Sequence, residues 1–188
     1  EMADAGIRAT SLAANELEFA CLLASQVTLA MVPGDTERAL DLVMEAAERF
    51  GLDLRRMGSQ AWILGRMSTL VAEIEALGVE SIGARPRLEV PLYAAIAQLL
   101  LASSNAAYLA GDIHLYAALG LTIIELGLAH GIEAATGVAF VQLALVVAST
   151  LADYEAARRY CDVGFALLER CPDASLQGMS WVNKGSTI

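Results

Sequence analysis

Apolar and polar residues follow one another along most of the chain with the spacing of an α-helix. Between Thr36 and Phe50, for example, Ala39, Val43 and Ala46 recur every three or four positions and lie on one helical face. No stretch alternates apolar and polar residues for long, as a half-buried strand would. The pattern therefore predicts an all-α fold.

Proline and glycine divide this pattern into segments. All four prolines (Pro33, Pro86, Pro91 and Pro172) fall at the boundaries of expected helices, where they interrupt no helix interior. Together with capping residues at helix starts and glycines at helix ends, they predict the helix boundaries. The expected helices cover approximately residues 4–31, 36–50, 59–77, 91–110, 113–130, 134–151 and 154–170, and a further segment opens at Asp173 or Ser175.

A short motif recurs at three of these boundaries. Gly34-Asp35, Gly111-Asp112 and Ala152-Asp153 each precede a helix. Repeats of about 40 residues with two helices each are typical of an α-solenoid, because a helical hairpin can bury its apolar face only against the next hairpin. We expect about 7–8 helices in one continuous superhelix. Hairpins would fill residues 1–78 and 89–188, and residues 79–88 would form a linker.

The segment 151–157 (Leu-Ala-Asp-Tyr-Glu-Ala-Ala), followed by an apolar helix and Pro172, resembles the second half of a tetratricopeptide repeat (TPR). Segments 39–53, 90–112 and 125–131 resemble the helical region of large bacterial signalling proteins. Those proteins combine a Ser/Thr-kinase-like domain and an AAA-type ATPase, often with GAF and histidine-kinase modules. The resemblance implies TPR-like hairpins, a role in signal transduction, and a chain that is a fragment of a longer polypeptide.

Composition supports a helical chain and disfavours nucleic acid as a partner. Ala and Leu, both strong helix formers, supply 64 of the 188 residues. The formal net charge is −10, whereas phosphate contacts require Lys and Arg. The three cysteines, Cys21, Cys161 and Cys171, have no metal-binding spacing and are expected to be buried reduced thiols. They favour a cytoplasmic location.

Membrane insertion has to be considered, because residues 90–111 and 134–152 carry no charge and are long enough to span a bilayer. Three features argue against it. Gln98, Ser103, Ser104 and Asn105 interrupt the first stretch, the turn at Gly111-Asp112 is short, and no Lys or Arg lies between Arg87 and Arg158. We therefore expect no membrane insertion.

Candidate catalytic chemistry is sparse. The sequence has no phosphate-binding loop and no kinase catalytic loop. His114 and His130 lie at opposite ends of one expected helix and cannot share a metal ion from it. Glu73 and Glu75 are two positions apart and face different ways, so they form no acid/base pair. We predict no catalytic residue, cofactor site or metal site, and a solvated loop for Arg85 and Arg87.

The polar residues in the apolar segment 90–111 allow two interpretations. Gln98 and Asn105 are seven positions apart, which places them on one helical face where they could line a groove. The alternative is hydrogen bonding between helices. The sequence as a whole predicts a non-catalytic, TPR-like interaction or coupling segment of a signal-transduction ATPase or kinase protein. Its partner would be a protein or a neighbouring domain, and a ligand-sensing helical domain of an ATP-dependent transcription regulator is the alternative.

Overall fold

The computed structural model describes residues 13–173, 176 and 180, and this part of the chain is mostly helical. It contains nine helices and no strand. Apart from the helices, the described residues hold one isolated bridge between Arg87 and Ile132. The expected all-α class is thus confirmed. The helices are α2 (Glu16–Met31), α3 (Thr36–Phe50), α4 (Leu54–Met57), α5 (Gln60–Leu77), α6 (Val79–Ala84), α7 (Pro91–Leu109), α8 (Ile113–His130), α9 (Ala134–Leu151) and α10 (Tyr154–Arg170).

The long helices from α3 onward begin and end close to where the capping residues predict. α2 begins only at Glu16, after Asn15 accepts a hydrogen bond from the Glu18 N–H, so the expected helix over residues 4–31 is wrong at residues 13–15. Ser59 caps α5 by accepting a hydrogen bond from the Trp62 N–H, and Gly51 ends α3 in a left-handed conformation. The short helices α4 and α6 were not expected from the sequence. Residues 4–12 of the first expected helix, and most of the segment after Asp173, lie outside the described residues.

The turns at Gly34-Asp35 and Gly111-Asp112 have the same backbone geometry. In each turn the Gly has φ near +80°, and its N–H donates to a carbonyl three residues earlier. The Asp N–H donates five residues back, to Ala30 in the first turn and to Ala107 in the second. These are the two hydrogen bonds of a Schellman motif. Asp35, Asp112 and Asp153 then cap the following helices with their carboxylates. The recurring motif is therefore a recurring local structure.

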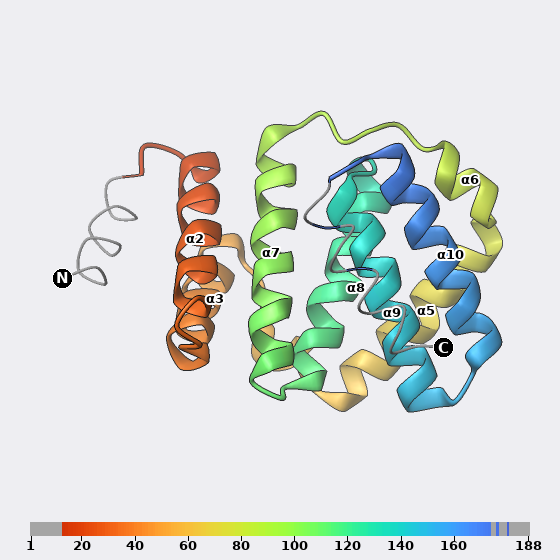
Figure 1. Ribbon diagram of the computed structural model, residues 1–188, viewed down its shortest axis with the longest axis horizontal. Coiled ribbons are helices and arrows are strands. Elements are labelled where there is room, and N and C mark those ends of the chain that lie inside the picture. Colours follow the sequence, from red (N-terminus) through yellow and green to blue (C-terminus); the bar gives the residue numbers. More distant parts are fainter. Residues whose placement is uncertain (1–12, 174–175, 177–179, 181–188) are drawn as a thin grey trace.

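Helices that follow one another in the second half of the chain also lie beside one another. Figure 1 shows α7, α8, α9 and α10 running alternately up and down, with α2 and α3 beyond α7. α5 packs against α8, and α6 packs against α10. Buried apolar side chains from α2 through α10 form one continuous cluster.

α9 and α10 pack backbone to backbone at a pair of glycines. A Cβ on Gly137 would lie 2.9 Å from the Gly164 carbonyl oxygen, and a Cβ on Gly164 would lie 2.6 Å from the Gly137 carbonyl oxygen. Only glycine at both positions permits this approach. Ala39, Ala46 and Ala157 are also buried, as expected for small residues at helix contacts.

The expectation that the chain does not insert into a membrane is wrong, because three helices are long and apolar enough to cross a bilayer. These helices are α7, α8 and α9, with 18 or 19 residues each, and a bilayer span needs about 20. The polar residues of α7 are a weak argument against a membrane span. Ser103 and Ser104 donate their hydroxyl groups to the Leu99 and Leu101 carbonyls of their own helix, which lowers the cost of placing them in an apolar medium. Within the fold, 72% of the apolar window of α9 is buried.

Candidate functional site

Residues 85–88, here called the strap, lead from α6 to α7 and cross the turn between α8 and α9. The Leu88 N–H donates to the Ile132 carbonyl at 3.1 Å, and the Ile132 N–H donates to the Pro86 carbonyl at 2.9 Å. Gly131 allows this contact, since its φ is +123° and a Cβ there would lie 2.8 Å from Leu88 Cα. The segment 79–88, expected to be a linker, consists of α6 and this strap.

Arginine side chains fasten the strap and α6 to the ends of two helices. Arg85 donates from Nη1 to the Leu128 carbonyl, and Arg87 donates from Nη2 to the Arg170 carbonyl. Both carbonyls lie in the last turn of a helix, where they lack partners in the helix and where the helix dipole favours a cation. Arg170 in turn donates from Nη1 to the Gly83 carbonyl. Arg85 and Arg87 are therefore anchoring residues. Arg87 is exposed, as expected for a solvated loop, whereas Arg85 is partly buried and departs from that expectation.

One open cleft, the α5/α8 cleft, lies between α5 and α8 beside Arg85 and has a volume of about 660 Å³. Arg66 and Glu125 join its two walls through a 2.5 Å contact between Nε and Oε1. The hydrogen bond with Glu125 raises the pKa of the Arg66 guanidinium. Arg85 Nε is buried at the cleft without a hydrogen-bond partner among the described residues. The cleft is lined by Arg66, Glu73, Ala76, Leu77, Arg85, Glu125, Leu128 and Ala129.

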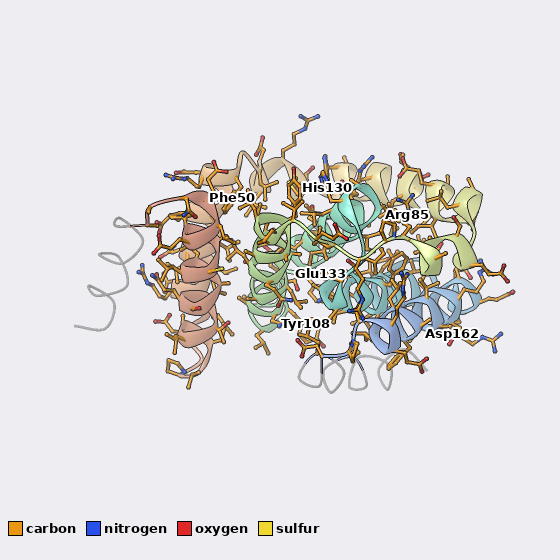
Figure 2. The ribbon with its side chains drawn as sticks, turned by 90° about the horizontal axis from the view of Figure 1, so that it is seen from above. Phe50, Arg85, Tyr108, His130, Glu133 and Asp162 are labelled. Atoms are coloured by element: carbon orange, nitrogen blue, oxygen red, sulfur yellow. The ribbon has the colours of Figure 1, made fainter. Side chains whose placement is uncertain are left out.

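A second depression, the Glu133 pocket, lies where the strap meets the start of α9 and has a volume of about 370 Å³. Figure 2 looks down on this end of the fold and shows Glu133 near the strap and Arg85 at its start. Burial raises the pKa of the Glu133 carboxyl from 4.5 to about 7. Glu133 Oε1 is buried without a hydrogen-bond partner among the described residues. The pocket is lined by Arg87, Leu88, Gln98, Ile132, Glu133, Ala134, Cys171, Pro172 and Asp173.

The structure separates the two residues predicted to line one groove. Gln98 is exposed and lines the Glu133 pocket. Asn105 is partly buried and lines neither this pocket nor the α5/α8 cleft. Ser104, from the same polar run, accepts a 2.9 Å hydrogen bond from Gln142 Nε2 of α9. The run therefore contributes one contact between helices and one pocket residue.

The other candidate residues do not converge on a reactive site. His114 and His130 are both exposed, and the His130 ring stacks on Tyr93 with 3.9 Å between ring centroids. Glu73 faces the α5/α8 cleft, whereas Glu75 lies 3.9 Å from Arg159 of α10. The described residues contain no group of three or more His, Cys, Asp or Glu side chains that could hold a metal ion. Cys161 is buried as expected, but Cys21 is exposed.

Sequence reasoning missed Glu133 and the Arg66–Glu125 pair. A weak signal for Glu133 existed, since it is the last charged residue before a charge-free helix. Arg66 and Glu125 are 59 residues apart, and nothing local links them.

Comparison with known proteins adds no relative. No protein-family model, no curated protein and no solved structure matches this chain. The function must therefore be argued from the residues of the two depressions.

Proposed function

We propose that this chain is a non-catalytic, TPR-like interaction or coupling segment, and that a partner protein or neighbouring domain docks in the α5/α8 cleft. The observation that carries the proposal is the cleft itself. It is open, has a volume of about 660 Å³, and presents apolar and charged side chains side by side. Interfaces of this kind combine an apolar centre with a polar rim.

The walls of the cleft suit an elongated partner segment. α5 and α8 have 18 residues each, which corresponds to about 27 Å of helix. Leu77, which is 37% exposed, offers apolar surface together with Leu128 and Ala129. Glu73 and Arg85 supply charges of opposite sign for orientation. An amphipathic helix or an extended peptide from a partner fits this description.

The recurring turns support the TPR-like part of the proposal. The Schellman motif followed by an Asp cap joins α2 to α3 and α7 to α8 in the same way. Repeating one turn gives repeated hairpins, and stacked hairpins leave extended surfaces for partners. The resemblance to bacterial signalling proteins adds the expectation that docking couples this segment to an ATPase or kinase domain.

Site-specific photo-cross-linking tests the docking site. A photoreactive residue replaces Ala76 in the cleft, and the control places it at Glu155, which is exposed on α10. Expressed in the native host, the Ala76 variant should give one dominant cross-linked band, to a partner or to another domain of the same polypeptide. Cross-linking that is equally weak or equally unspecific at both positions would contradict the proposal.

A further inference from the structure

The Glu133 pocket is independent of the α5/α8 cleft and brings together side chains from four parts of the chain. The strap supplies Arg87 and Leu88, α7 supplies Gln98, the start of α9 supplies Glu133, and the end of α10 leads to Asp173. A cation, two carboxylates and an amide thus share one depression with apolar neighbours. At about 370 Å³ it has the size of a small-molecule site.

The Glu133 carboxyl accepts a hydrogen bond from the Thr136 N–H in the capping box of α9, but one of its oxygens has no partner among the described residues. Its Oε1 is buried and makes no hydrogen bond to any described residue. A buried carboxylate oxygen without a donor costs free energy, and more so when the group is charged. A ligand that donates a charged N–H to this oxygen would remove that cost. This favours an ammonium group at Glu133.

Arg87 provides donors for the opposite charge. The Arg170 carbonyl takes one N–H of Arg87, which holds the guanidinium at the wall of the pocket. A guanidinium has five N–H donors, so others can bind a carboxylate. Gln98 is exposed and can pair with a polar side chain of the ligand. The Asp173 carboxylate accepts a hydrogen bond from the Leu176 N–H at 3.3 Å, which fixes its position.

Other classes of ligand fit the lining less well. A multiply charged anion such as phosphate would be repelled by Glu133 and Asp173, and a purely apolar molecule would leave Glu133 Oε1 unpaired. We propose that the Glu133 pocket binds a small zwitterion that carries one ammonium and one carboxylate group, of the size of a single amino acid. The ammonium group lies at Glu133 and the carboxylate at Arg87.

Calorimetric titration of the purified chain with individual amino acids tests this site. Alanine has two matched probes, because propionate lacks the ammonium group and ethylamine lacks the carboxylate. We expect at least one amino acid to bind with a Kd below about 10 mM, and its single-charge counterparts to bind at least about tenfold more weakly. Absence of binding by every common amino acid at about 10 mM would overturn the proposal.

Variants assign the binding to this pocket. Glu133→Gln keeps the side-chain shape and should weaken binding at least about tenfold. Gln98 is exposed, so Gln98→Ala should leave the fold intact. This substitution should change which amino acids bind most tightly. Glu155→Gln, on the exposed face of α10, is the matched control and should bind as the unmodified chain does. Unchanged affinity in both Glu133→Gln and Gln98→Ala, with melting curves that show folded protein, would also overturn the proposal.

Discussion

Gly164 of α10 and Gly137 of α9 touch backbone to backbone. A Cβ on Gly164 would lie 2.6 Å from the Gly137 carbonyl oxygen and 2.7 Å from Val141 Cγ2. Contacts this short force the surrounding atoms to shift, and here the nearest atom belongs to the backbone. The pair therefore fixes the distance between α9 and α10.

Gly164→Ala should destabilise the fold by overpacking this contact. We expect a loss of about 1–3 kcal/mol in the free energy of unfolding, measured by chemical denaturation. Gly65→Ala is the matched control, because a Cβ at this exposed position in α5 meets no atom within 4 Å. Gly65→Ala should gain up to about 1 kcal/mol from helix propensity. Equal effects of the two substitutions would show that α9 and α10 do not meet at Gly164.

Gly131→Ala should break the contact between the strap and the turn that joins α8 to α9. Its Cβ would lie 2.8 Å from both Leu88 Cα and Leu88 N. We expect a larger loss of stability than for Gly111→Ala, because Gly111 has φ +78° and no atom lies within 4 Å of its added Cβ. Gly131 has φ +123° and ψ 157°, a conformation that is essentially confined to glycine, so backbone strain adds to the clash. Amide hydrogen exchange at Ile132 and Leu88 should accelerate only in Gly131→Ala. Unchanged exchange at both amides would contradict the strap contact.

Gln142 and Ser104 should behave as a coupled pair. Ser104→Ala removes the acceptor of the buried Gln142 Nε2 donor, which should cost about 1–3 kcal/mol. Gln142→Leu combined with Ser104→Ala leaves no unpaired amide and should cost less than the sum of the single changes. A double-mutant cycle in denaturant measures the coupling. If the losses in the free energy of unfolding for the two single substitutions simply add up in the double variant, the hydrogen bond contributes nothing to stability.

The Glu133 carboxyl should make stability depend on pH. Its pKa is raised to about 7 in the folded chain from 4.5, so the folded state binds the proton more tightly than the unfolded state. Stability should therefore fall as pH rises from about 4.5 to about 7, by roughly 1–3 kcal/mol. Glu133→Gln removes this loss, so its stability relative to the unmodified chain should increase over the same range. Parallel pH profiles of the two proteins would contradict the burial of Glu133.

Most of the fold could be predicted from local signals. Pro91 at the start of α7, Asp112 before α8 and Gly51 after α3 each act on neighbouring backbone groups, so their effect can be read from the sequence. The expectation of no membrane insertion is wrong for α7 because polar residues in a sequence do not show where they bond. Hydroxyl groups such as those of Ser103 and Ser104 look polar in a sequence, although they bond within their own helix.

The candidate sites could be predicted only in part, because they depend on distant segments. Gln98 stands out in the sequence as a polar residue in an apolar helix, and the structure places it at the Glu133 pocket without Asn105. Arg85 and Arg87 find their acceptors on α8 and α10, 43 and 83 residues away. Those carbonyls come into reach only when Gly131 lets the strap approach. No local pattern encodes this meeting of three segments.

The most direct test of the docking proposal is the affinity of the cross-linked partner segment for two leucine variants. Leu77→Asp places a charge in the α5/α8 cleft, and Leu17→Asp places one on α2, away from the cleft. The two leucines are 37% and 36% exposed, so the substitutions disturb the fold to a similar degree. The proposal predicts at least about tenfold weaker binding by Leu77→Asp and unchanged binding by Leu17→Asp. Equal affinities would contradict it.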